Sequence, residues 1–144
     1  WIANACNKLQ GQFTSGVCSI AQRAALAALQ GNGESQMIMR DAFLRRRNLI
    51  CNLLKEVEGM KVSIPQGAFY VMPDITWYLG KSDGKTKIEN SEDLALYLLD
   101  RAQVATVGGD AFGAPDCLRI SYATSDDLLI EAVKRIKVAL KRLT

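Results

Sequence analysis

The sequence predicts an α/β (α+β) fold in which helices pack on one face of a small mixed sheet. Apolar residues recur every three to four positions over residues 35–58, 91–103 and 124–143, which is typical of helices with one buried face. Between these stretches the apolar period falls to two over short segments, which indicates strands. Helices that alternate with pairs of short strands favour a sheet covered by helices on one side.

The beginning of the chain is expected to form two helices that belong to a larger domain. Residues 1–9 predict a short apolar helix. Residues 19–30 predict a second helix, so rich in alanine and leucine that protein should cover both of its sides. The chain starts at Trp1 with residues typical of a helix interior, so we expect this start to be a cut. We therefore divide the chain into residues 1–34, the end of a large domain, and residues 35–144, a small C-terminal domain.

The small domain is expected to open with a long helix over residues 35–58, closed by Gly59. The outward side of this helix carries three consecutive arginines, residues 45–47, which we interpret as a solvated or interface-facing side. The polar stretch 80–90 predicts an exposed loop. Strands are expected at residues 61–64, 68–72, 104–107 and 117–122.

Composition limits the classes of partner. The chain has 144 residues, 49% of them hydrophobic, which suffices for one ordinary core. Its net charge of +3 is too small to favour nucleic acid or an anionic membrane as a partner. No apolar run is long enough for a transmembrane helix, and the first residues lack the pattern of a signal peptide. These features predict a soluble, cytoplasmic protein.

Cysteine and histidine usage limits the chemistry. The four cysteines are widely spaced, show no CxxC pattern and lie in apolar stretches, so we expect buried free thiols in a reducing compartment. Histidine is absent, which excludes Ser-His and Cys-His nucleophile pairs and the common imidazole metal sites. We expect no metal site, and any catalysis must use carboxylates, lysine, tyrosine or a cofactor.

Arg119 is the first candidate for a functional residue, because it interrupts an otherwise apolar strand. Removing a guanidinium from water is costly unless an anion meets it. Its planar fork of donors suits a carboxylate bound through two parallel hydrogen bonds. The alternatives are that Arg119 pairs with an acid of its own fold or lies on a sheet edge.

Two further segments are weaker candidates. Residues 65–70 (Pro-Gln-Gly-Ala-Phe-Tyr) form a turn that feeds an aromatic strand, which suits either a ligand pocket or a hairpin with core aromatics. The glycine-rich residues 108–113 resemble a phosphate loop but lack the Walker lysine and a GxGxxG pattern. A Schiff-base lysine must be desolvated, and none of the lysines lies in a stretch that predicts this.

Taken in order, these segments resemble the C-terminal portion of class I (fold-type I) pyridoxal-phosphate-dependent aminotransferases of the aspartate aminotransferase kind. The resemblance runs from Trp1 to Leu143 without a large gap. The segments that carry it are the turn and helix start at 14–22, the arginine-bearing helix at 45–47, the signature at 65–70, the strand and loop at 104–113, and the strand at 118–123. In one departure, Gly108 stands where the family often has proline.

The resemblance implies transamination between an amino acid and a 2-oxo acid through pyridoxal phosphate, in a homodimeric parent. Aspartate is the expected substrate, although alanine, aromatic and related amino acids share the same contact. In the family, the arginine that matches Arg119 binds the substrate α-carboxylate. The turn with Thr14 and Ser15 lies near the neighbouring subunit's site.

The resemblance also implies that the chemistry lies outside this chain. The Schiff-base lysine, the aspartate that faces the pyridine nitrogen, the ring-stacking aromatic and most phosphate ligands would all precede Trp1. In this family the cofactor supplies the reaction's chemistry and the protein binds and orients it. We therefore expect this chain alone to be inactive, with no catalytic residue of its own, and not to bind the cofactor.

One alternative belongs to another class: a non-catalytic α+β module that binds RNA or a protein partner. The small sheet and the mild positive charge permit it. The strands, however, lack the exposed aromatic pattern of an RNA-recognition sheet. A salt-dependent titration with single-stranded RNA discriminates the two hypotheses.

Overall fold

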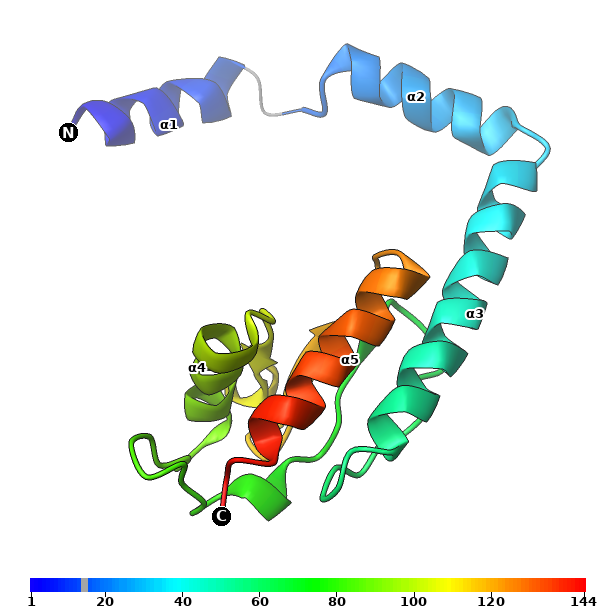
Figure 1. Ribbon diagram of the computed structural model, residues 1–144. Coiled ribbons are helices and arrows are strands. Elements are labelled where there is room, and N and C mark those ends of the chain that lie inside the picture. The colour runs from blue at the N-terminus through cyan, green and yellow to red at the C-terminus, as the bar shows by residue number, and fades with distance from the viewer. Residues whose placement is uncertain (14–15) are drawn as a thin grey trace. The chain divides into compact units, whose positions relative to one another are not determined.

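A computed structural model describes residues 1–13 and 16–144 of the chain, which fall into two compact units, Trp1–Met39 and Arg40–Thr144. The boundary between the units lies within helix α3 (Glu34–Lys55), whose course is visible in Figure 1. Across the described residues, no helix combines the length and the hydropathy needed to cross a membrane.

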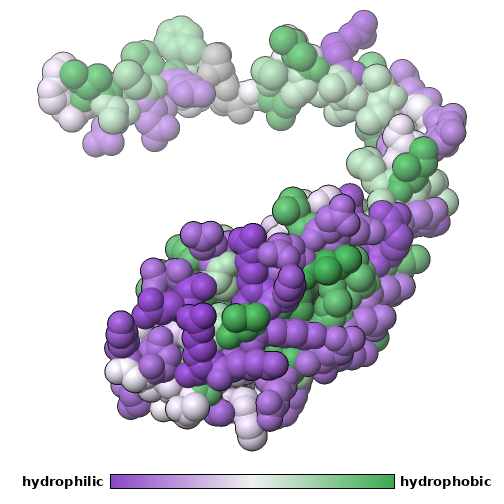
Figure 2. All heavy atoms as spheres, in the orientation of Figure 1, coloured by the Kyte–Doolittle hydropathy of each residue, from purple (hydrophilic) through white to green (hydrophobic). Residues whose placement is uncertain are grey.

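The first unit contains helices α1 (Ile2–Phe13) and α2 (Ser19–Gln30), and neither has a buried residue. Figure 2 shows hydrophobic and hydrophilic residues interspersed along this unit. The prediction that α1 ends near Leu9 was wrong, because one internal glycine costs a helix only about 1 kcal/mol. The expectation of buried thiols was also wrong for Cys6 and Cys18, which are exposed.

The sheet of the second unit has three short strands in the order β1 (Tyr70–Val71), β3 (Leu118–Ser121), β2 (Val107–Gly108). Both pairings are antiparallel, so the described sheet is antiparallel and not mixed as predicted. Val71 pairs with Ile120 on one side of the central strand. Val107 pairs with Arg119 on the other.

All four predicted strand regions are longer than the observed strands, and two of them pair hardly at all. Of residues 61–64, only Lys61 is paired, through an isolated bridge to Asp74. Pro65 follows directly and has no N–H to continue a ladder. The segment predicted at 104–107 pairs only from Val107 onward.

Helices α4 (Ser91–Ala102) and α5 (Asp126–Leu140) lie close to their predicted positions, and α3 ends at Lys55 instead of residue 58. The Ser125 side chain accepts from the Leu128 N–H and so caps the start of α5. Two short 3₁₀ helices complete the unit, η1 (Thr76–Tyr78) and η2 (Gly109–Phe112).

The core lies between one face of the sheet and the helices. Val71, Leu118 and Ile120 point to this face and are buried. The helices meet them with apolar side chains that include Ile50, Leu54, Leu94, Leu98, Leu129, Val133 and Ile136. The predicted arrangement of helices on one face of a small sheet is therefore confirmed. Because side chains alternate along a strand, Arg119 and Tyr70 belong to the opposite face.

Candidate functional site: an arginine between two aromatic rings

Arg119 lies on the central strand of the sheet, on the face opposite the helical core. Its neighbours Leu118 and Ile120 are buried, whereas Arg119 itself is half-buried. Strands pair with β3 on both sides, so the residue is not on a sheet edge. The first alternative from the sequence, an edge position, is therefore excluded.

Two aromatic rings flank the Arg119 guanidinium. Its central carbon lies 4.5 Å from the centre of the Tyr70 ring and 4.1 Å from the centre of the Phe112 ring. Both distances are within the range of cation–π attraction. Such contacts use the faces of the guanidinium, whereas its N–H donors lie in the plane of the group.

No acid of the described chain takes up those donors: no hydrogen bond or ion pair of the Arg119 side chain occurs in residues 1–13 and 16–144. The second alternative from the sequence, pairing with an internal acid, is therefore not found in the described chain. A positive, planar group held between two rings with unused donors is suited to a planar anion such as a carboxylate.

The glycine-rich loop positions Phe112. The backbone N–H of Gly109 donates both to the Cys117 carbonyl oxygen, at 2.9 Å, and to the buried Ser91 hydroxyl, at 3.1 Å. A Cβ at Gly109 would lie 2.0 Å from the Ala114 carbonyl oxygen, so only glycine fits. The loop thus packs against the start of α4. Ser91 was missed from the sequence, where it was indistinguishable from any serine that begins a helix.

The segment 65–70 is tied to the rest of the unit from two sides. The Tyr122 hydroxyl donates to the Ala68 carbonyl oxygen at 2.9 Å, and the Tyr122 N–H donates to the Phe69 carbonyl oxygen at 2.9 Å. From α3, Arg47 donates to the Pro65 carbonyl oxygen at 3.3 Å. These bonds fix the segment that delivers Tyr70 to Arg119.

The tyrosine that makes this connection is fully inside the protein. Tyr122 is 1% exposed and its ring meets Phe43 edge-on, with 6.4 Å between ring centres. Burial raises the pKa of Tyr122, so the hydroxyl stays protonated and able to donate near neutral pH. Phe69 stacks on the same Phe43 ring at 5.9 Å. The aromatic residues of this segment therefore serve packing as well as the Arg119 environment.

The arginine run in α3, interpreted from the sequence as a solvated or interface-facing side, remains partly solvated and also connects two helices. Arg45 and Arg46 both bond the Asp126 carboxylate, at 3.0 Å and 3.4 Å. The hydrogen bond from Arg45 is the main cause that lowers the pKa of Asp126, although Arg45 remains largely exposed. Asp126 stands in the first turn of α5, where a negative charge is favourable. The arginines thus join α3 to α5.

The described residues do not suit covalent attachment of a pyridoxal cofactor. A Schiff-base lysine must lie in a desolvated position, yet every lysine of the chain is exposed or half-exposed. The lysines of this chain therefore do not fit covalent attachment of pyridoxal phosphate. Thr14 and Ser15, predicted to lie near a neighbouring subunit's site, fall outside the described residues.

Comparison of the sequence with known proteins finds similarity to aminotransferases. The sequence profile of the family "Aminotransferase class I and II" matches residues 1–136. A bifunctional aspartate aminotransferase and glutamate/aspartate-prephenate aminotransferase of Petunia hybrida is 52% identical over 140 residues, which cover 94% of this chain and 29% of that protein. An aspartate/prephenate aminotransferase of Cereibacter sphaeroides is 47% identical over 137 residues, which cover 94% of this chain and 34% of that protein.

The similarity extends to three dimensions. The crystal structure of an aspartate aminotransferase from Rhizobium meliloti superposes with a TM-score of 0.86 at 40% sequence identity, covering 94% of this chain and 34% of that structure. The chain therefore belongs to the class I and II aminotransferase family. It spans about a third of the length of the relatives that it matches.

Proposed function

We propose that this chain is the C-terminal portion of a pyridoxal-phosphate-dependent aminotransferase that moves an amino group between an amino acid and a 2-oxo acid. Residues 1–34 would be the end of the large domain, and residues 35–144 the small domain. The proposal rests on family membership together with the setting of one residue, Arg119.

Arg119 is proposed to bind the substrate α-carboxylate. The supporting observation is its unused fork of donors, held between the Tyr70 and Phe112 rings on the face away from the core. A charge in this setting gains most from a ligand that is itself a planar anion. A carboxylate common to all α-amino acids meets that requirement without selecting among side chains.

Aspartate is the proposed preferred substrate. Support comes from the relatives, of which the Rhizobium meliloti structure and the Petunia hybrida protein are both described as aspartate aminotransferases. The second description also names prephenate, so a 2-oxo acid with a second carboxylate is the matching class of amino-group acceptor. Both classes of ligand carry the carboxylate proposed for Arg119.

Pyridoxal phosphate, when bound by the complete enzyme, would supply the electron sink for this chemistry. The lysine that holds it would lie outside this chain, because none of the chain's lysines is buried. The chain alone is accordingly proposed to be inactive and not to retain the cofactor. Its own contribution is to bind and orient the substrate through Arg119.

A homodimeric, cytoplasmic parent enzyme completes the proposal. The turn with Thr14 and Ser15 would lie near the partner subunit's site, as the family resemblance implies. The apolar side chains that line α1 and α2 support a covered position for this unit, since exposed apolar surface of this extent is unusual in a free domain. The four free cysteines fit a reducing compartment.

A graft experiment tests the proposal. Residues 1–136 replace the matching segment of the Rhizobium meliloti aspartate aminotransferase, and steady-state kinetics are measured with aspartate and 2-oxoglutarate. We expect an active chimera, because the two chains superpose over 94% of this sequence. In that chimera, Arg119→Lys should lower kcat/KM by the equivalent of roughly 2 to 5 kcal/mol of transition-state stabilisation. The reason is that lysine keeps the charge but not the two parallel hydrogen bonds.

The matched control is Arg101→Lys. Arg101 is another arginine of the same unit, paired with Asp83 and Asp100. Its replacement by lysine keeps the positive charge of these pairs and should leave kcat/KM unchanged. Unchanged kinetics in Arg119→Lys, with cofactor absorbance retained, would contradict the role given to Arg119.

A further inference from the structure

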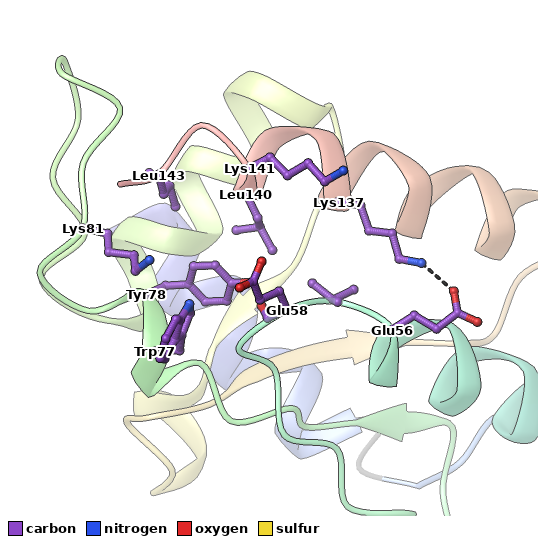
Figure 3. Close-up of a pocket in the computed structure, with 10 residues that line it drawn as sticks. Glu56, Glu58, Trp77, Tyr78, Lys81, Lys137, Leu140, Lys141 and Leu143 are labelled. Atoms are coloured by element: carbon purple, nitrogen blue, oxygen red, sulfur yellow. Dashed lines mark hydrogen bonds and ion pairs between the residues drawn. The ribbon is translucent and has the colours of Figure 1, made fainter.

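A cavity of about 450 Å³ opens in the Arg40–Thr144 unit. Three segments form it: the turn that follows α3, the η1 region, and the C-terminal end of α5 with the tail (Figure 3). Arg119 is not among its lining residues. Its volume lies in the range of small-molecule sites.

The cavity has an apolar base and one large aromatic wall. Val57, Tyr78, Leu140 and Leu143 line it and are almost completely buried. Trp77 also lines it but is 55% exposed, which is unusual for the largest apolar side chain. This ring is firmly seated, because its atoms pack so closely on Gly59 that a Cβ there would lie 2.0 Å from Trp77 Cδ1. A half-exposed indole is a suitable surface for an aromatic ligand.

Charged groups of both signs surround this apolar base. Lys137 is already paired with Glu56 at 2.7 Å. The Lys81 ammonium lies 4.9 Å from the centre of the Trp77 ring. Glu58 and Lys141, by contrast, enter no ion pair within the described part of the chain. Figure 3 shows Glu58 beside the Tyr78 ring and Lys141 on the α5 side of the cavity.

The Tyr78 hydroxyl is already hydrogen-bonded within the protein and is not available to a ligand. It donates to the Glu58 carbonyl oxygen, and burial together with the Glu58 charge raises the pKa of Tyr78 to about 12. The groups left to meet a ligand are therefore one carboxylate, Glu58, two ammonium groups, Lys81 and Lys141, and the Trp77 ring.

We propose that this cavity binds a free α-amino acid with an aromatic side chain, at a site separate from Arg119. The ligand's ring would lie against Trp77, its ammonium group would meet Glu58, and its carboxylate would meet Lys141 and Lys81. A zwitterion suits the site because it supplies a partner of opposite charge to each unpaired group, which a simple anion or cation would not do. The site goes beyond the proposed transamination and does not depend on it.

The 144-residue chain itself provides the assay. Trp1→Phe leaves Trp77 as the sole tryptophan, since the sequence contains two. Titration with L-phenylalanine, which does not absorb at the excitation wavelength of tryptophan, should change Trp77 fluorescence saturably. 3-Phenylpropionate lacks the ammonium group and 2-phenylethylamine lacks the carboxylate, so each should bind about tenfold more weakly.

Single substitutions test whether L-phenylalanine binds in this cavity. Glu58→Gln and Lys141→Met should each weaken L-phenylalanine binding by about tenfold, with the far-UV spectrum and thermal midpoint unchanged. Lys134→Met, an exposed lysine of the same helix outside this cavity, and Arg119→Gln should leave it unaltered. The proposal is overturned by an absent or non-saturable change, by equal binding of 3-phenylpropionate, or by loss of binding in Arg119→Gln.

Discussion

The Arg119 guanidinium carbon lies 4.1 Å from the centre of the Phe112 ring, although Phe112 belongs to a glycine-rich loop with no ligand-binding pattern of its own. The centre of the Tyr70 ring lies 4.5 Å from the same carbon. Together the two rings limit the positions that the guanidinium can adopt. A side chain that is ordered before the ligand arrives loses less conformational entropy on binding. We therefore propose that Phe112 positions Arg119 for its ligand.

Phe112→Leu should weaken substrate binding in the chimera that carries this segment. Leucine keeps an apolar side chain but removes the ring face, which contributes about 0.5–1 kcal/mol to an exposed cation–π contact. We expect KM for aspartate to rise about two- to fivefold with kcat nearly unchanged. Phe112→Tyr keeps the ring and serves as the control. An equal rise in both variants, or a fall in kcat alone, would argue against positioning through the ring.

Gly109→Ala should destabilise the chain strongly. The added Cβ would meet the Ala114 and Cys117 carbonyl oxygens at 2.0 Å and 2.6 Å, and backbone atoms cannot move aside as a flexible side chain would. We expect a loss of about 1–3 kcal/mol or more in the free energy of unfolding, measured by urea denaturation. Gly67→Ala is the matched control, because nothing lies within 4 Å of a Cβ there. Similar midpoints for the two variants would refute the close packing of the loop.

Much of this architecture was predictable because it depends on local patterns. The capping serine before α5 and the three- to four-residue apolar repeat placed that helix, and the apolar residues around Arg119 placed it in a strand. Residues 61–64 were mispredicted because alternation alone does not provide a partner strand. Lys61 found only an isolated bridge.

The environment of Arg119 was not predictable in the same way. Tyr70 and Phe112 meet the guanidinium only through antiparallel pairing of β1 and β2 with β3, which brings together segments distant in the sequence. The contacts of the α3 arginines were not predictable from the sequence either. Their partner Asp126 lies 81 residues from Arg45, so a run interpreted as a solvated or interface-facing helix side connects two helices.

Asp126→Asn should change how stability depends on pH. The hydrogen bond and charge of Arg45, with a smaller contribution from Arg46, lower the pKa of Asp126. A carboxyl whose pKa is lower when folded stabilises the fold above its unfolded pKa, about 4, and loses this contribution as pH falls through the folded pKa. The wild-type thermal midpoint should therefore exceed that of Asp126→Asn at pH 7, and the difference should vanish in strong acid.

Salt and a neighbouring acid provide the controls for this prediction. The difference at pH 7 should shrink in 1 M salt, because the Arg45 side chain is largely exposed and its attraction to Asp126 is screened. Asp127 stands beside Asp126 in the first turn of α5 but has no ion pair with a described residue. If Asp127→Asn reproduced the whole effect, the helix terminus and not the α3 arginines would be responsible.

Tyr122→Phe should release the segment that carries Tyr70. The substitution keeps the ring contact with Phe43 but removes the hydroxyl that donates to the Ala68 carbonyl oxygen. Ala68 has φ of 58°, a left-handed conformation that costs a non-glycine residue about 1 kcal/mol or more. The hydrogen bond from the Tyr122 hydroxyl offsets part of this cost. We expect a loss of about 1–2 kcal/mol in the free energy of unfolding by urea denaturation.

Ala68→Gly separates the lost bond from the backbone conformation. Glycine adopts this φ without penalty, so Ala68→Gly should restore part of the stability when it is added to Tyr122→Phe. Alkaline titration provides a second readout. Burial raises the pKa of Tyr122, so its contribution to stability is complete below the unfolded pKa of about 10 and is lost as pH rises through the folded pKa. Wild type should therefore lose more stability than Tyr122→Phe above about pH 10, and parallel curves for the two proteins would show that the hydroxyl is not held as described.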